Sequence, residues 1–151
     1  MINLHAALMD AEVVDLGFDT APIIYFVEAN PRYNDLVTEV FQLVAAGYHN
    51  GFTSAISLTE VLVHPLRRGN TTLQQRYRDL LLYSENFHII VIDAEIAERA
   101  AGLRARYNSR TPDSLQIAAA LSAKCEAFLT NDRGLSRVTE LKILVLDDLE
   151  L

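Results

Sequence analysis

Apolar positions along the chain alternate between short continuous runs and longer stretches with a helical repeat. Short apolar runs bounded by polar or turn-forming residues are typical of buried strands. Five such runs cover residues 13–18, 52–55, 88–92, 127–130 and 142–146. Between them, apolar residues recur every three or four positions, which favours helices. Strands that alternate with helices predict an α/β fold: a central parallel five-stranded sheet flanked by helices on both faces.

Start and stop signals divide the helical stretches. Pro22 suits a first helical turn, and Pro31 ends the helix that follows the first strand. Further helices are expected over residues 36–46, from 57 onward, and over 73–83, 94–107 and from 111 onward. The His64-Pro65 pair is expected to interrupt the helix that begins at Ser57. The second and third strands would then be joined by two helices that form a small flap.

Length and composition are those of one domain over residues 1–151, with residues 1–12 as an N-terminal extension. Cys125 is the only cysteine, which excludes an intrachain disulfide and fits a reducing compartment. The first residues lack the basic flank and apolar run of a signal peptide. No apolar run reaches the roughly 20 residues that span a bilayer. We therefore expect a cytoplasmic protein that does not enter a membrane.

The formal net charge of −7 runs against binding to nucleic acid, because such proteins usually carry a basic surface. Acidic residues gathered around bound cations would reduce this conflict. The basic residues are also clustered, which leaves room for local positive patches. The clusters contain Arg67, Arg68, Arg76, Arg78, Arg99, Arg104, Arg106 and Arg110. For any one of these arginines, however, a solvated helix face is the favoured explanation.

Acidic side chains follow the expected strands at the points where the strands end. Asp19 ends the first strand, Glu60 lies on the helix after the second, and Asp132 follows the fourth. Asp113 lies in the first turn of the helix that leads into the fourth strand. Sites in open parallel sheets form at the carboxyl ends of the strands, near the switch point in strand order. We expect these four carboxylates to meet there.

Each acidic residue also has an ordinary explanation. Asp19 is a plausible helix cap, and Asp113 suits the positive end of a helix dipole. Ser57 and Glu60 have the spacing of a capping box, and residues 131–134 are good turn formers. Four converging carboxylates, however, repel one another unless positive charge is present. Mg²⁺ or Mn²⁺ would supply it, since both prefer oxygen ligands and retain bound water. Such a site suits hydrolysis of a phosphodiester without a covalent nucleophile.

Four segments in order resemble the motifs of the PIN-domain family, and most closely its VapC-type toxin ribonucleases. They are Asp19-Thr20, residues 54–62, residues 111–118 and residues 128–132. The resemblance implies a three-layer fold with strand order 3-2-1-4-5 and RNA cleavage dependent on Mg²⁺ or Mn²⁺. It also implies a homodimer and inhibition by a co-expressed antitoxin.

The resemblance further implies a role for individual residues. Asp19 and Asp113 would be the principal metal ligands. Glu60 and Asp132 would complete the acidic site, directly or through water. Thr20 and Thr130 would be supporting hydroxyls that orient it.

Two other interpretations remain open. One is a PIN-like binding module without turnover, which a buried pairing of Asp19 or Asp113 with an arginine would favour. The other is a phosphoryl-accepting receiver domain, which also places carboxylates and a metal at strand ends. A receiver needs a lysine on a facing loop. Lys124 and Lys142 are the only lysines, and neither follows a strand suitably.

Overall fold

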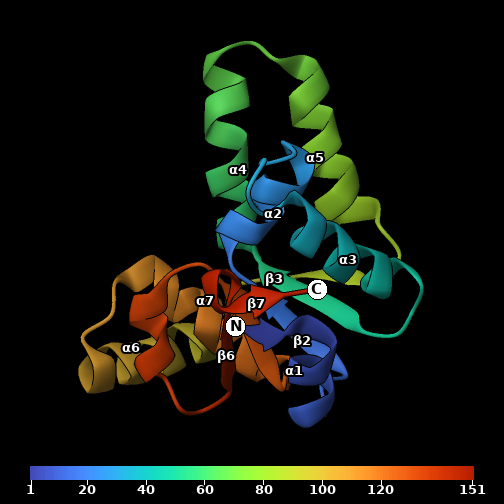
Figure 1. Cartoon of the computed structure of the whole chain (residues 1–151). Helices are drawn as coiled ribbons and strands as arrows, with labels where there is room; N and C mark the ends of the chain where they lie inside the picture. Colours follow the sequence, from blue (N-terminus) through green and yellow to red (C-terminus); the bar gives the residue numbers. More distant parts are fainter.

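Five parallel strands form the central sheet, in a computed structural model that describes residues 1–151 (Figure 1). They are β2 (Asp15–Phe18), β3 (Asn50–Ser54), β4 (Phe87–Ile90), β5 (Ala127–Thr130) and β6 (Lys142–Val145). Their order in the sheet is β4-β3-β2-β5-β6. Counted along the chain, this order is 3-2-1-4-5, so the predicted topology is confirmed. The strand order reverses at β2, and a ligand site is expected beside its carboxyl end.

Helices cover both faces of the sheet, as the alternating pattern predicted. They are α1 (Leu4–Asp10), α2 (Thr20–Val27), α3 (Asn34–Ala45), α4 (Ala55–Arg67), α5 (Thr71–Tyr83), α6 (Ala94–Tyr107) and α7 (Thr111–Ser122), with short 3-10 turns η1 (Arg133–Arg137) and η2 (Leu146–Asp148). One hydrophobic core joins α6 and α7 to one face, and a larger core joins α1 to α5 to the other. Helices α4 and α5 extend from the sheet as a hairpin (Figure 1). None of the helices combines the length and apolar character needed to cross a membrane.

Strand β2 sends alternate residues to opposite faces, and this alternation sets the distance to α7. Leu16 and Phe18 are buried in the larger core. Gly17 faces α7, where an added Cβ would lie 2.8 Å from the Cβ of Ala120 and 2.9 Å from Cδ1 of Phe128. Only a residue without a side chain permits this close approach. Helix α7 therefore packs directly against β2, and Gln116 in the middle of α7 reaches Thr20, just beyond β2, at 3.1 Å.

The N-terminal segment is part of the packed structure. Leu4, Ala7 and Leu8 of α1 are buried in the larger core. The preceding strand, β1 (Ile2–Asn3), pairs in parallel with β7 (Leu149–Glu150), so the two ends of the chain lie together (Figure 1). Asn3 caps α1 by accepting the N–H of Ala6 at 3.0 Å.

The expected break at His64-Pro65 is wrong, because α4 continues through Pro65 to Arg67. Proline removes one backbone donor, but it lies in the last turns of the helix, where few bonds depend on it. The N–H of Arg68 still reaches the carbonyl of His64 at 3.1 Å. The carbonyl of Pro65 accepts from the side chain of Gln74 on α5 at 3.2 Å, so the neighbouring helix supports this turn.

Candidate active site

The carboxylate of Asp19 lies where β2 ends and α2 begins. Its Oδ1 accepts the N–H of Thr20 at 2.9 Å, and its Oδ2 accepts the hydroxyl of Thr130 at 2.7 Å. Thr130 is the last residue of β5, and its Oγ1 also accepts the N–H of Asp132 at 3.0 Å. One hydroxyl therefore joins the carboxylate of Asp19 to the loop that carries Asp132.

The carboxylate of Glu60 reaches the same edge from α4. Its Oε1 accepts the hydroxyl of Thr20 at 2.9 Å. Thr20 is buried, whereas Glu60 is exposed. Thr20 thus donates its backbone N–H to Asp19 and its hydroxyl to Glu60. The two threonines therefore contact different carboxylates, Thr20 that of Glu60 and Thr130 that of Asp19.

Asp113 lies in the first turn of α7 and makes an ion pair with Arg110. Its Oδ2 is 3.0 Å from Nε of Arg110, and its Oδ1 is 3.5 Å from Nη2. The side chain of Asp113 is 13% exposed, but that of Arg110 is 78% exposed. A pair with an exposed arginine is typically worth about 1 kcal/mol or less. The pair is little exposed at Asp113 but open to solvent at Arg110, so it is not the fully buried pairing that would indicate an inert site.

The predicted acidic residues act through their charges on the ionisation of Asp19 and of Arg110. Burial raises the pKa of the Asp19 carboxyl above its ordinary value, and the negative charges of Asp113 and Glu60 raise it further. The bonds from Thr130 and the Thr20 amide oppose this rise. On the other side, the hydrogen bond and charge of Asp113 raise the pKa of Arg110, as do the charges of Asp132 and Glu60. The site carries an excess of negative charge that one arginine only partly offsets.

Helix capping explains the positions of two of these carboxylates. Asp19 caps α2, and Asp132 caps η1 by accepting the N–H of Gly134 at 2.9 Å. The capping-box explanation for Ser57 and Glu60 is wrong. Ser54 caps α4, with its hydroxyl accepting the N–H of Ile56 at 3.1 Å. Helix α4 begins at Ala55, so Ser57 lies inside it, and Glu60 turns toward Thr20 instead of back to the helix start.

The residues suit a hard divalent cation in their chemistry. The predicted ligands and their supporting threonines offer only carboxylate and hydroxyl oxygens, and burial, together with the charges of Asp113 and Glu60, disfavours ionisation of Asp19 in the absence of a cation. As placed, however, no group of three or more acidic, histidine or cysteine side chains is arranged to hold one ion. The carboxylate of Asp113 is turned toward Arg110. Asp19 and Asp113 would hold a cation together with water, and Glu60 and Asp132 would complete the site directly or through water.

Sequence interpretation did not place two residues at this edge, Arg110, which it named only as one of the clustered arginines, and Gln116. Gln116 lies three positions after Asp113 and therefore on the same side of α7. It is 3% exposed, and its amide contacts hydroxyls of α2 and α4. The signal was available: a glutamine on the buried side of an alanine-rich helix needs polar partners. The sequence does not say which partners these are.

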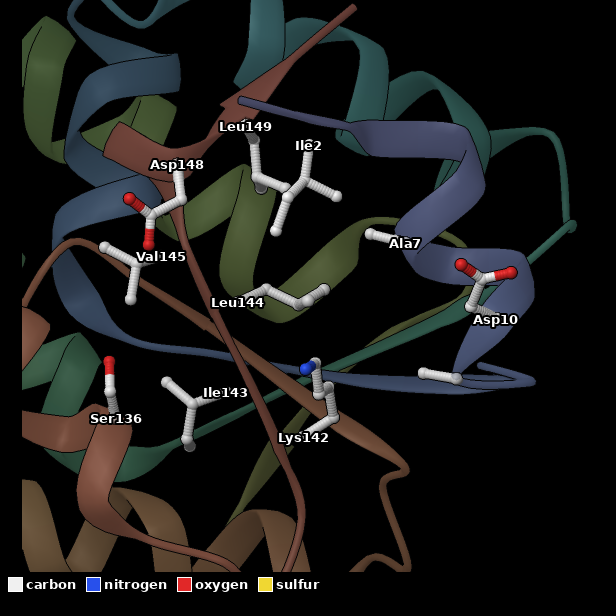
Figure 2. A pocket seen from close by; sticks show the side chains of 11 residues that line it. Ile2, Ala7, Asp10, Ser136, Lys142, Ile143, Leu144, Val145, Asp148 and Leu149 are labelled. Atoms are coloured by element: carbon white, nitrogen blue, oxygen red, sulfur yellow. The ribbon is translucent and has the colours of Figure 1, made fainter.

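A separate cavity lies between α1 and β6 and has a volume of about 420 Å³. Figure 2 shows that apolar side chains of β6 and of the chain ends line it. Three charged residues, Lys142, Asp10 and Asp148, line it as well. None of the four predicted acidic residues lines it. The carboxylate of Asp148 is already paired with Arg133 at 2.8 Å. The acidic edge and this cavity are therefore different parts of the molecule.

Comparison with known proteins identifies a family. The family model described as PIN domain matches residues 18–141. No curated protein matches the chain by sequence at a significant level. Among solved structures, a toxin–antitoxin complex from Klebsiella pneumoniae is 26% identical, with a TM-score of 0.65 over 87% of this chain and 97% of that one.

Two further structures share the fold at lower identity. VapBC2 from Rickettsia felis, bound to a DNA fragment from its promoter, has a TM-score of 0.70 at 18% identity, covering 87% of this chain and 98% of that one. DNA-bound VapBC from Salmonella typhimurium has a TM-score of 0.64 at 17% identity, covering 88% and 98%. These two likenesses support the fold.

Proposed function

Because the chain belongs to the PIN-domain family, we propose that it is a divalent-metal-dependent endoribonuclease whose site is formed by Asp19, Glu60, Asp113 and Asp132. The observation that carries this proposal is the pair of carboxylates, Asp19 and Glu60, that Thr20 joins at the carboxyl end of β2. Asp19 is held by Thr20 and Thr130, and its pKa is raised by burial and by the neighbouring carboxylates. A carboxylate that only capped a helix would not need to be buried or to lie near other carboxylates.

The four acidic side chains have two kinds of role in the proposed reaction. Asp19 and Asp113 would hold Mg²⁺ or Mn²⁺, and Glu60 and Asp132 would act directly or through water. When bound, the cation supplies positive charge for the phosphodiester and activates water for in-line attack. Thr130 fixes the rotamer of Asp19, and Thr20 fixes that of Glu60. No side chain is required as a covalent nucleophile.

Incubation of the purified protein with a panel of single-stranded and structured RNAs tests this function. With Mn²⁺ we expect internal cleavage that stops when a chelator removes the metal, because the carboxylates alone repel a phosphodiester. Parallel incubation with single-stranded DNA shows whether the activity is specific for RNA. No cleavage of any RNA in Mn²⁺, together with no detectable binding of Mn²⁺, would contradict the proposal.

We further propose that the protein is the toxin of a type II toxin–antitoxin pair, active as a homodimer and held inactive by an antitoxin. The K. pneumoniae structure, which is a toxin–antitoxin complex, supports this role at 26% identity over most of both chains. A small gene beside the coding sequence, whose product co-purifies with this chain and suppresses its RNA cleavage, is the expected observation. Co-purification without suppression would contradict inhibition by that partner.

The second candidate is a binding module without turnover, and the ion pair between Arg110 and Asp113 is the observation in its favour. If that pair were permanent, Asp113 would not bind metal. An exposed pair is weak, however, and a divalent cation competes with it directly. The two functions therefore differ in what removal of Arg110 does.

Arg110→Gln is expected to raise the affinity for Mn²⁺ by about two- to fivefold, the factor that corresponds to an exposed ion pair. Calorimetric titration of Mn²⁺ into the variant and the wild type measures this. Arg99→Gln removes an exposed arginine of α6 at another place and serves as the control. Unchanged or weaker Mn²⁺ binding in Arg110→Gln would show that Arg110 does not compete with the metal.

A further inference from the structure

The buried amide of Gln116 lies where α2, α4 and α7 meet beneath the acidic edge. Its Nε2 lies 3.1 Å from the hydroxyl oxygen of Thr20 and 2.7 Å from that of Ser57. Its Oε1 lies 2.5 Å from the hydroxyl oxygen of Ser54. All these side chains are buried, and no buried side-chain nitrogen or oxygen of the protein lacks a partner. The direction of each bond can therefore be found by counting protons.

Ser54 determines which way the amide of Gln116 points. The oxygen of Ser54 already accepts the N–H of Ile56 at 3.1 Å as the cap of α4. Its own proton needs an acceptor, and Oε1 of Gln116 is the acceptor within reach. With Oε1 facing Ser54, both protons of Nε2 face the other side. The cap of α4 thus sets the orientation of an amide on α7.

Ser57 has one hydroxyl proton, and it donates that proton to Thr53. Thr53 donates its hydroxyl to the carbonyl of Phe18 at 2.9 Å, so in its 2.7 Å contact with Ser57 the donor is Ser57. The single proton of Ser57 is then used, and it cannot be given to Thr20. Ser57 also accepts one proton of Nε2 from Gln116.

Thr20 receives the other proton of Nε2, which leaves its own proton for an acceptor. Two are within reach, the carboxylate of Glu60 at 2.9 Å and the oxygen of Ser57 at 3.1 Å. The bond to a carboxylate is charge-assisted and stronger, so Thr20 donates to Glu60. If the amide were reversed, its oxygen would face Thr20 and compete with Glu60 for this proton. As oriented, Gln116 offers Thr20 no acceptor, and its Nε2 occupies Ser57, the only other oxygen within reach, so the proton of Thr20 is left to Glu60.

We infer that Gln116 is a positioning residue, which fixes the carboxylate of Glu60 at the metal site through the hydroxyl of Thr20. The inference rests on the proposed function, because it assigns Glu60 to a metal site. Gln116 itself does not touch the carboxylate. Without a committed donor, the exposed side chain of Glu60 is free to leave the site for solvent.

Gln116→Met keeps the length and volume of the side chain and removes both bonding groups. We expect Mn²⁺ affinity, measured by calorimetry without RNA, to fall about tenfold, as is usual when an outer partner of a metal ligand is lost. Thr20→Val should have the same effect, and Thr20→Ser, which keeps the hydroxyl, should restore wild-type affinity. The double variant Gln116→Met/Thr20→Val should lose no more than either single variant, because both act through one bond.

Gln74→Met is the matched control. It makes the same substitution at another buried glutamine, whose Nε2 donates to the carbonyl of Pro65 at 3.2 Å and contacts none of these hydroxyls. It should destabilise the protein as Gln116→Met does and leave Mn²⁺ affinity within about twofold of wild type. Where Gln116→Met folds poorly, the comparison of Thr20→Val with Thr20→Ser tests the hydroxyl alone.

Two results would overturn the inference. Mn²⁺ affinity within twofold of wild type in both Gln116→Met and Thr20→Val would do so, and so would losses that multiply in the double variant. Both leave the proposed function intact, since the wild type still binds Mn²⁺. Absence of Mn²⁺ binding in the wild type would overturn the inference and the proposed function together.

Discussion

Replacing Asp19 by Asn is expected to lower the rate of Mn²⁺-dependent RNA cleavage by more than about a hundredfold. Loss of an outer partner of a metal site costs 10- to 100-fold, and loss of a ligand should exceed that. Asn is nearly the same shape and can still accept the N–H of Thr20, which Asp19 accepts at 2.9 Å, so the start of α2 should persist. Single-turnover cleavage of a labelled RNA in Mn²⁺ measures the effect.

The same variant should be no less stable than the wild type when metal is absent. The pKa of Asp19 is raised in the folded protein, so the fold prefers the protonated carboxyl. The contribution of Asp19 to the free energy of unfolding is then most favourable below the ordinary pKa of an aspartate, 3.8, and falls as the pH rises through the higher pKa of the folded state. Asn cannot ionise, so this fall disappears in the variant. Loss of activity and retained stability together indicate a residue kept for function.

Thermal unfolding in chelator, from acidic to neutral pH, measures the change in stability. Asp79→Asn, at an exposed position of α5, is the control and should alter neither the pH dependence nor cleavage. A variant at Asp19 that unfolds well below the wild type at neutral pH would show that Asp19 is chiefly a structural cap. Retained cleavage in that variant would remove Asp19 from the site.

The largest effect on stability is expected for Phe18→Ala, at about 3–5 kcal/mol of unfolding free energy. Phe18 has no exposed surface, and its ring centroid lies 5.0 Å from that of Phe41 and 5.2 Å from that of Phe87. The variant would leave a cavity at the centre of the larger core, where β2, β4 and α3 meet. Because Asp19 follows directly, the start of α2 should also lose its support.

Urea denaturation of Phe18→Ala beside Phe52→Ala tests this assignment of the core. Phe52 lies on the other face of the sheet, is only partly buried and packs against His88 at a centroid distance of 5.1 Å. Its removal should cost clearly less than that of Phe18. An equal decrease in the free energy of unfolding in the two variants would show that Phe18 and its aromatic neighbours contribute no more to stability than Phe52 does.

The fold was predictable because its signals are local. The helix over residues 94–107 was predicted with its observed bounds, since Asp93 caps its start and Asn108 adopts the left-handed conformation at its end. The strand at residues 127–130 was likewise predicted as observed, and its wholly buried pattern explains the continuous apolar run. Pro65 misled the prediction because a tertiary contact, from Gln74 of the next helix, supports the turn that the proline weakens.

The site was predictable only in part. Acidic residues at strand ends are visible in the sequence, and the topology of a parallel sheet brings those ends together. The partners of these residues are not visible. Thr20 donates a hydrogen bond to Glu60, 40 positions away along the chain, and contacts Gln116, 96 positions away. Such bonds depend on how three helices meet, which no local pattern encodes. The ion pair between Arg110 and Asp113 spans only three positions, but the same spacing occurs on many exposed helix ends.

The most direct measurement is calorimetric titration of Mn²⁺ into the wild-type protein and into Asp113→Asn, without RNA. Asp113 is brought to β2 by the packing of α7 and is one of two proposed ligands. If the acidic edge is a metal centre, the wild type will bind Mn²⁺ in a defined stoichiometry, and the variant will bind it far more weakly. Equal binding in both proteins, or none in the wild type, would contradict a metal centre formed by these residues.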